Sequence, residues 1–198
     1  MPTPERVGRL RTVAEQRQGG IVVFQDIHDP HNAEAALRSL DGFGFQYAWF
    51  IFEQEQPFDP RRVGKSSSAS ANKWLEYKVF YSTTTALRTL RELGYEVVAT
   101  VPAPDAEPLF EAKFLRREIA LLFGNEHRGL TEEAIAGADR RIVIPMAGMV
   151  RSLNLSVTVA ICLYEVTRQR RAAGMERFLL PEEERERMFR RWLQREED

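Results

Sequence analysis

Runs of hydrophobic residues alternate with amphipathic stretches along most of the chain, and this alternation is typical of α/β proteins. Short runs rich in β-branched and aromatic residues predict strands at residues 21–24, 47–52, 77–81, 95–100, 119–123 and 141–144. Between them, apolar positions three and four residues apart predict helices at residues 32–41, 84–93, 131–138 and 155–171. The pattern therefore predicts one α/β domain, with no internal repeat.

The sequence pattern also predicts a helix at each end of the chain, outside this alternating core. A helix over residues 4–17 ends before Gly19-Gly20, and a last helix begins at Pro181 with acids in its first turn, as the helix dipole favours. The last helix has an apolar face that covers either its own core or a partner: Met188, Phe189, Trp192 and Leu193. We therefore divide the chain into an N-terminal helical extension (1–19), a core domain (20–172) and a C-terminal helical extension (173–198).

Residues 53–76 interrupt the alternation with prolines and a serine-rich run, which predicts a long loop of functional or mobile character. The loop contains Gly64-Lys65-Ser66, which is the end of a phosphate-binding P-loop motif. The first glycine of that motif is replaced by Asp59, whose carboxylate would repel phosphates. We therefore do not expect a nucleotide hydrolase.

The composition is that of an ordinary globular protein, with 198 residues, 43% of them hydrophobic and 29% charged. No signal-peptide pattern opens the chain, no apolar run is long enough to span a membrane, and a single cysteine forms no internal disulfide; together these favour a cytoplasmic location. Three histidines and one cysteine are a poor ligand set for zinc, so we expect no metal site. Cys162 falls on the apolar face of a helix, where we expect buried packing.

Three clusters of residues indicate chemistry. The first is Pro30-His31-Asn32, with Arg38 six residues after Asn32; here Asn32 is a plausible helix N-cap, and a solvated surface arginine is the simpler interpretation of Arg38. The second, residues 121–130, is a buried strand that ends in two glycines around Glu126, where ligands of open α/β sheets bind. The third, residues 142–157, is a strand, an apolar loop with few charges and a helix entered at Ser152 and Asn154.

These clusters, in this order and at this spacing, resemble the SPOUT class of RNA methyltransferases, specifically its SpoU/TrmH branch. The family pattern G-x-E-x-x-G-[LI], then I-x-I-P-M-x-G and S-L-N-[VL]-S, reads here as residues 124–130, 142–148 and 152–156. The first motif, H-N-x-x-A-x-x-R, is present at His31, Asn32, Ala35 and Arg38. The resemblance covers residues 20–176 and is closer to the tRNA guanosine 2′-O-methyltransferases of the TrmH type.

The resemblance implies a SPOUT-type fold: a parallel sheet with helices on both faces and a deep C-terminal trefoil knot. It also implies a homodimer, in which Arg38 of one subunit completes the site of the other. S-adenosylmethionine (AdoMet) would bind among the knot loops. The residues implied to bind it are Thr100, Gly124, Asn125, Glu126, Gly129, Ile144, Met146 and Leu153.

The implied reaction is methyl transfer to a ribose 2′-hydroxyl of RNA, with Arg38, Asn32, Glu126, Ser152 and Asn154 as catalytic residues. Arginine is a poor general base because its pKa lies above ~12. The proton therefore passes either to a neighbouring phosphate or to an Arg38 that is deprotonated on binding. Asp29 and Glu34 are acidic where the family has a basic and a small residue, which leaves the RNA target open.

RNA contact requires local charge, because 28 basic and 29 acidic residues leave a net charge of −1. Residues 60–90 hold six basic residues and one acid, which suits a phosphate backbone. The expected RNA-binding residues are Arg61, Arg62, Lys65 and Lys73 in and near the long loop, and Arg6, Arg9 and Arg11, with Arg17, at the N-terminus. Alternatives to a tRNA methyltransferase are an rRNA methyltransferase, a catalytically silent RNA-binding protein of this fold, and a small-molecule binding protein.

Overall fold

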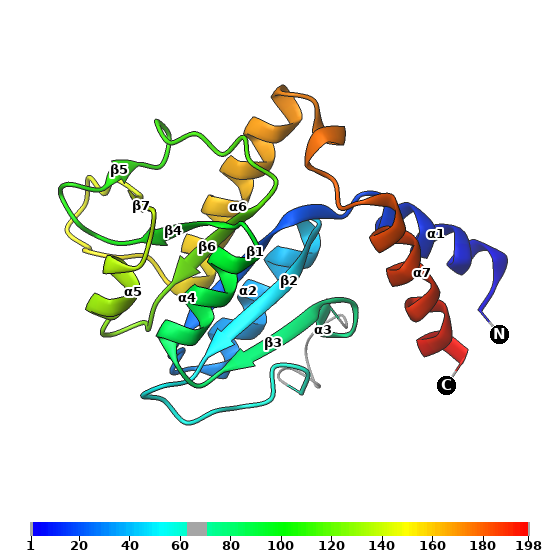
Figure 1. Ribbon diagram of the computed structural model, residues 1–198, viewed down its shortest axis with the longest axis horizontal. Coiled ribbons are helices and arrows are strands. Elements are labelled where there is room, and N and C mark those ends of the chain that lie inside the picture. The colour runs from blue at the N-terminus through cyan, green and yellow to red at the C-terminus, as the bar shows by residue number, and fades with distance from the viewer. Residues whose placement is uncertain (1, 63–70, 198) are drawn as a thin grey trace.

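The computed structural model describes residues 2–62 and 71–197, and its centre is a seven-stranded sheet with every strand pair parallel (Figure 1). The strands are β1 (Gln18–Gln25), β2 (Phe45–Ile51), β3 (Glu76–Phe80), β4 (Glu96–Thr100), β5 (Glu107–Pro108), β6 (Ile119–Phe123) and β7 (Arg140–Val143). They lie in the order β3-β2-β1-β6-β4-β7-β5. β1 and β6 are buried along their whole length, because elements on both faces of the sheet cover them.

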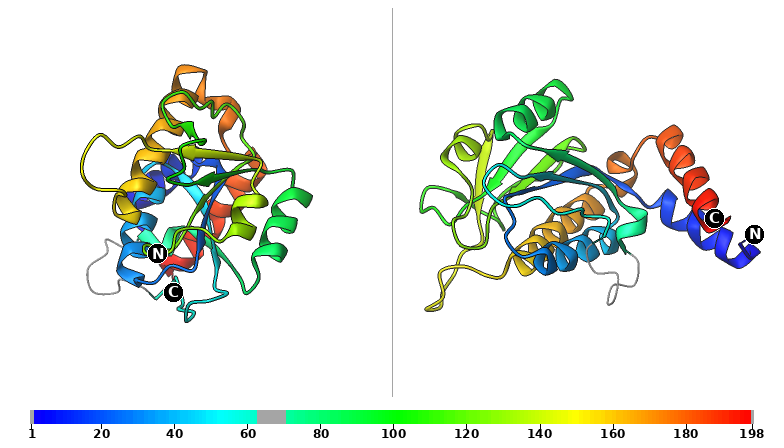
Figure 2. Two further views of the ribbon diagram at one scale, coloured as in Figure 1. Left: turned by 90° about the vertical axis from the view of Figure 1, so that its left-hand side faces the viewer. Right: turned by 90° about the horizontal axis from the view of Figure 1, so that it is seen from below.

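Helices cover both faces of the sheet, as the right-hand view of Figure 2 shows. One face carries α2 (Pro30–Gly42), α6 (Leu155–Ala172) and the short α3 (Ala71–Trp74); the other carries α4 (Thr83–Glu92) and α5 (Glu132–Ala136). Successive residues of β1 alternate between the two cores: Val22 and Phe24 pack toward α2 and α6, and Ile21 and Val23 toward α4. The predicted parallel sheet with helices on both faces is confirmed.

The two ends of the chain form a helix pair. α1 (Pro4–Glu15) packs against α7 (Glu182–Glu197), which follows the 3₁₀ turn η1 (Met175–Phe178), and the pair projects from one side of the sheet with both termini at its far end (Figure 1). Met188, Phe189 and Trp192 of α7 are buried with Leu10 and Ala14 of α1. The apolar face of the last helix therefore covers a core of its own chain. No helix in the described part of the chain combines the length and apolar character that a membrane crossing needs.

The start of α2 differs from the prediction. The helix begins at Pro30, and Asp29 rather than Asn32 is the N-cap, accepting a hydrogen bond from the His31 amide at 2.9 Å. The fixed φ of proline suits the first helical position, so the acceptor just before it is the better cap. The Asn32 side chain is therefore left for another contact.

Residues 53–76 are not one continuous loop, because α3 and the first residue of β3 fall within this range. Tertiary packing stabilises this part of the chain: Leu75 is buried, and the Trp74 ring lies edge-on to Trp192, 5.5 Å between centroids. The two-residue strand β5, which lacks a hydrophobic pattern, forms by pairing with β7. Residues 63–70, including Lys65 and the Gly64-Lys65-Ser66 segment, lie outside the described residues.

Candidate active site

The loop after β6 approaches its own backbone closely. Asn125 and Gly129 pair through two backbone hydrogen bonds, N to O at 3.0 and 2.9 Å. A Cβ on Gly124 would lie 2.3 Å from backbone atoms of Gly129 and Leu130, so only glycine fits this position. Gly129 has a φ of +71°, a conformation that glycine adopts most easily, so the tight loop that presents Glu126 requires both predicted glycines.

The Glu126 carboxylate lies at the N-terminus of α2. It accepts hydrogen bonds from the amides of His28 and Asp29 at 3.0 and 3.3 Å, and from Asn32 Nδ2 at 2.9 Å. A negative charge in this place is stabilised by the helix dipole and by amides that lack helical partners. Glu126 therefore joins the second sequence motif to the first.

Asn154 joins the third motif to the same network. Its Nδ2 donates to Asn32 Oδ1 at 3.0 Å, while its Oδ1 caps α6 by accepting from the Ser156 amide at 2.8 Å. A chain of hydrogen bonds therefore runs from Glu126 through Asn32 to Asn154. It connects residues that are up to 122 positions apart in the sequence.

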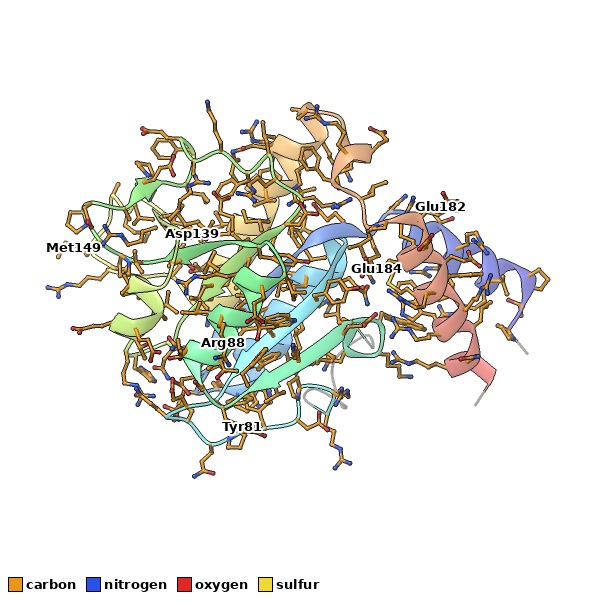
Figure 3. The ribbon with its side chains drawn as sticks, viewed as in Figure 1. Tyr81, Arg88, Asp139, Met149, Glu182 and Glu184 are labelled. Atoms are coloured by element: carbon orange, nitrogen blue, oxygen red, sulfur yellow. The ribbon has the colours of Figure 1, made fainter. Side chains whose placement is uncertain are left out.

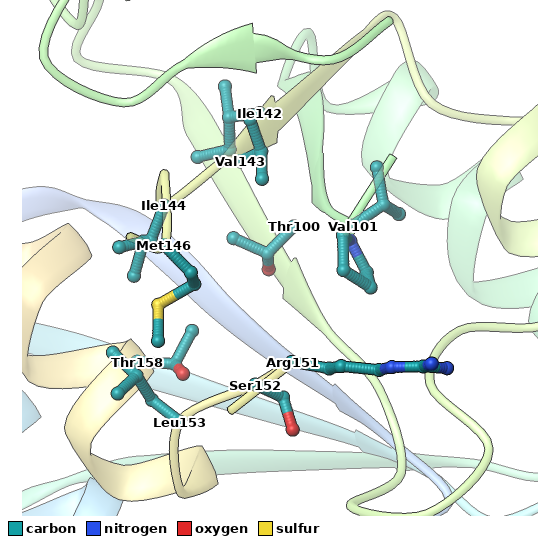
Figure 4. A pocket seen from close by; sticks show the side chains of 11 residues that line it. Thr100, Val101, Ile142, Val143, Ile144, Met146, Arg151, Ser152, Leu153 and Thr158 are labelled. Carbon is teal, nitrogen blue, oxygen red and sulfur yellow. The ribbon is translucent and has the colours of Figure 1, made fainter. Parts of the chain in front are cut away.

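A cleft of about 810 Å³ opens beside this network, between the loop after β6 and the loop at residues 144–154. A smaller cavity of about 100 Å³ adjoins it, with Ile144, Met146 and Leu153 on one side and Thr100 on the other (Figure 4). The cofactor residues predicted from sequence all line one or both of these spaces: Thr100, Gly124, Asn125, Glu126, Gly129, Ile144, Met146 and Leu153. Ser152 also lines both.

Arg38 is separate from this cleft. Its side chain is exposed on α2 and has no hydrogen bond or ion pair with any residue that the structure describes. Asn32 and Asn154, in contrast, are tied into the network. The structure thus brings together four of the five predicted catalytic residues, counting Ser152 in the cleft wall, and leaves the Arg38 guanidinium in solvent.

Two carboxylates at this edge of the sheet were missed by the sequence reasoning. Asp26 directly follows β1, and its Oδ1 accepts hydrogen bonds from three successive amides at residues 53–55, at 2.7, 2.9 and 3.1 Å. Glu55 pairs with His28 and Arg128; their hydrogen bonds hold the pKa of Glu55 below its ordinary value. An acid directly after a buried strand was a usable signal for Asp26. Glu55 lies in the loop after β2, which has no recognisable pattern.

The expected RNA-binding arginines differ in how free they are. Arg9 is exposed and makes no hydrogen bond or ion pair within the described residues. Arg11 is paired with Glu186 at 2.7 Å, and its guanidinium lies 3.9 Å from the centre of the Phe189 ring. Arg6 has its guanidinium 5.4 Å from the centre of the Trp74 ring.

Arg17 is not available to RNA, in contrast to the prediction. It is 1% exposed, bonded to Asp41 and to the Phe45 carbonyl, and covered by the Trp192 ring of α7. An arginine at the amino end of a strand next to a packed terminal helix is buried by that helix, which the local sequence does not show.

Near the long loop, Lys73 is exposed, and Arg61 and Arg62 both contact Asp59.

Cys162 is fully buried in the core against the sheet, as predicted. Burial raises the pKa of its thiol to about 12.

Among the described residues, no three His, Cys, Asp or Glu side chains converge as metal ligands would. His28 and His127 lie near each other, with ring centroids 5.6 Å apart, and His28 is paired with Glu55.

Comparison with known proteins decides the family. The model of the SpoU rRNA Methylase family matches residues 20–164. The chain belongs to this family. The tRNA (guanosine(18)-2′-O)-methyltransferase of Thermus thermophilus is 36% identical over 195 residues, which cover 98% of each protein.

Two solved structures of SpoU proteins have a similar fold. A TrmH/SpoU tRNA modifying enzyme from A. aeolicus aligns with a TM-score of 0.82 and 30% identity, covering 97% of this chain and 96% of the other. The SpoU methyltransferase AviRb from Streptomyces viridochromogenes, in complex with AdoMet, aligns with a TM-score of 0.67 and 27% identity, covering 79% and 59%. The predicted SpoU/TrmH resemblance is confirmed, and the chain is a methyltransferase of the SpoU family.

Proposed function

We propose that this SpoU protein transfers a methyl group from AdoMet to a ribose 2′-hydroxyl of RNA, with a guanosine in tRNA as its substrate. One observation carries the proposal: the hydrogen-bonded chain Glu126–Asn32–Asn154 joins all three motifs beside an open cleft. The Thermus thermophilus relative, named for tRNA guanosine methylation and similar over nearly the whole length of both proteins, supports the tRNA substrate.

The cleft fits AdoMet in size and chemistry. Its volume lies within the range of small-molecule sites, and its walls combine apolar side chains with the backbone of two tight loops. Ile144, Met146 and Leu153 would hold the flat adenine end, and the loop from Gly124 to Gly129 would hold the polar end. When bound, AdoMet supplies a methyl group activated by its sulfonium charge.

The residues of the chain then have to orient the ribose and deal with its proton. Holding the 2′-oxygen in line with the methyl group is the main contribution that geometry can make. Asn32, Ser152 and Asn154 supply oriented hydrogen-bonding groups, and Glu126 holds Asn32 and the start of α2 in place. Arg38 positions either the 2′-hydroxyl or a neighbouring phosphate. The phosphate accepts the proton of the 2′-hydroxyl.

We propose that the active form is a homodimer in which Arg38 reaches the cleft of the partner. The support is the free Arg38 side chain together with exposed apolar residues on the 144–154 loop and α6: Met149, Val150, Val157 and Tyr164. Figure 3 shows Met149 at the outer edge of the molecule, where it is fully exposed. Mixing Arg38→Ala with Glu126→Gln protein tests this arrangement: a composite site recovers activity on mixing, and a self-contained site does not.

We also propose that the segment after β6 is tied in a deep trefoil knot and that the protein works in the cytoplasm. The knot is supported by the path of the chain: β7 pairs with β4, and the chain then passes along the cleft to α6, on the face that carries α2. The cytoplasmic location follows from a tRNA substrate.

For RNA contact we propose Arg9, Arg61, Arg62 and Lys73, which are exposed on the described surface.

The deciding experiment incubates the protein with methyl-labelled AdoMet and separate tRNA and rRNA pools, followed by mapping of the modified nucleotide. We expect label at a guanosine 2′-oxygen of tRNA. Label confined to rRNA would favour the alternative substrate, which the description of the family supports. AdoMet binding without transfer to either pool would overturn the proposal in favour of a binding protein.

A further inference from the structure

Glu55 connects three loops at the carboxyl edge of the sheet. Its Oε1 accepts hydrogen bonds from Arg128 Nη2 at 2.5 Å and from Asn125 Nδ2 at 3.3 Å, and its Oε2 lies 3.2 Å from His28 Nδ1. Arg128 and Asn125 belong to the loop after β6, and His28 to the loop after β1. Glu55 itself belongs to the loop after β2, so a single carboxylate links the ends of three neighbouring strands.

Asp26 holds the segment that carries Glu55. Asp26 is 3% exposed. Its Oδ1 accepts hydrogen bonds from the three amides at residues 53–55, and its backbone carbonyl accepts a hydrogen bond from Asn125 Nδ2 at 2.6 Å. Its φ of +50° lies in the left-handed region, which costs free energy for any residue except glycine and is best tolerated by asparagine and aspartate. The backbone at Asp26 is therefore held in a strained conformation that turns the carboxylate onto the Glu55 segment.

The groups that Glu55 contacts are those that fix Glu126. The His28 ring lies against Glu55, while the His28 amide donates to Glu126. Asn125 and Arg128 flank Glu126 on its own loop and both contact Glu55. Glu55 therefore sets the position of the Glu126 loop and of an amide that the Glu126 carboxylate binds, although Glu55 is not among the residues that line the cleft.

We propose that Glu55, held in place by Asp26, is a positioning residue for Glu126 in methyl transfer. The inference rests on the proposed role of Glu126 in the site. The oxygen atoms of Glu55 keep Arg128 and His28 turned toward it, which leaves the Glu126 carboxylate to Asn32 and the start of α2. Without Glu55, Arg128 loses its partner and is free to compete for Glu126 two residues away.

The test compares Glu55→Ala with Glu55→Gln in single-turnover methyl transfer, with Gln56→Ala as a control, because Gln56 is exposed beside Glu55. We expect Glu55→Ala to slow transfer by about 10²-fold, the effect of a displacement on the order of 1 Å in a reacting group. Glu55→Gln retains most of the rate, because its amide oxygen still accepts from Arg128. AdoMet affinity, measured by calorimetry, falls in Glu55→Ala by less than the transfer rate does, because the loop that Glu55 holds also lines the cleft. The transfer rate and the AdoMet affinity of Gln56→Ala both stay near wild type.

A double-variant cycle shows whether Glu55 acts through Glu126. We expect Glu55→Ala to slow the residual transfer of a Glu126→Gln protein far less than it slows the wild type, because the group it positions is already lost. Additive effects, or a Glu55→Ala rate close to wild type, overturn the positioning role. A normal rate in Glu126→Gln alone overturns instead the proposed role of Glu126, so the two failures are distinguishable.

Discussion

Strands β1, β2 and β6 have one polar cluster at their amino ends and another at their carboxyl ends, and the two clusters differ in the charge at their centre. At the amino ends, Arg170 is fully buried, and its Nη atoms donate to the Gln18 side chain and to the carbonyls of Gly19, Arg116 and Arg117, at 2.5–3.3 Å. At the carboxyl ends, carboxylates and amides hold loops around an open cleft. The first cluster is a buried cation surrounded by acceptors of its own chain; the second has anions that shape a surface for ligands.

This difference separates stabilising charge from functional charge. Burial lowers the pKa of Arg170 to about 10, so it is still a cation at neutral pH, with its Nη atoms fully used within the chain. Arg38 is exposed and has no partner among the described residues. Of two arginines on neighbouring helices, the buried one therefore maintains the fold, and the free one is the candidate for chemistry.

The sharpest test of this contrast is Arg38→Ala. We expect methyl transfer to slow by about 10²- to 10³-fold, the effect of removing one hydrogen-bond donor from a reacting oxygen. AdoMet affinity stays near wild type, because Arg38 does not line the cleft. Rates come from labelled-methyl transfer, and Arg116→Ala, an exposed arginine at the opposite end of the sheet, is the matched control. Near-normal turnover in Arg38→Ala would remove Arg38 from the site.

Arg170→Met tests the other side of the comparison. The substitution keeps the apolar length but removes the Arg170 donor from four acceptors, of which the Gln18 side chain and the Gly19 carbonyl are buried, so we expect the free energy of unfolding to fall by about 3 kcal/mol. Urea denaturation measures this fall, with Arg171→Met, at an exposed neighbour on the same helix, as control. Below the transition, AdoMet affinity is expected to be unchanged. An Arg170→Met protein as stable as wild type would contradict the structural role.

Arg9 and Arg11 extend the contrast to the RNA surface. Arg9→Ala is expected to weaken RNA binding several-fold and to reduce the slope of log affinity against log salt by about 1. Arg11→Ala removes an exposed ion pair and a ring contact within the chain, so we expect a small loss of stability and no change of slope. RNA titrations at several salt concentrations, with denaturation curves, distinguish the two. Equal slopes for Arg9→Ala and wild type would exclude a phosphate contact by Arg9.

Cys162 gives the smallest expected effect. Because burial raises the pKa of its thiol to about 12, almost no thiolate is present at neutral pH, and the sulfur is out of contact with solvent. We expect iodoacetamide to leave the native protein unmodified and to label it once in denaturant, as followed by mass spectrometry. Labelling of the native protein at the rate of the unfolded chain would show that the core around α6 opens easily.

Much of the site was predictable, because its motifs are short and local. The glycines around Glu126 follow from a tight loop at a strand end, and the low charge of residues 144–150 reflects a loop beside a cleft. Prediction was wrong where a distant element decides the outcome. Arg17 is buried by Trp192, which is 175 positions later, and Asn32, which is not the N-cap of α2, instead donates to Glu126, 94 positions later.

The α/β class, the SpoU family and most of the residues of the cleft follow from the amino-acid sequence, since they depend on the period of the hydrophobic residues and on short local motifs. Which polar groups meet depends on how the strands are arranged in the fold. The sheet order places β6 beside β1 and β1 beside β2, so loops at residues 26–28, 53–55 and 125–128 converge although they lie far apart in the chain. Hydrogen bonds act over about 3 Å, so partners such as Glu55 and Arg128 are recognisable only once the strands are in order.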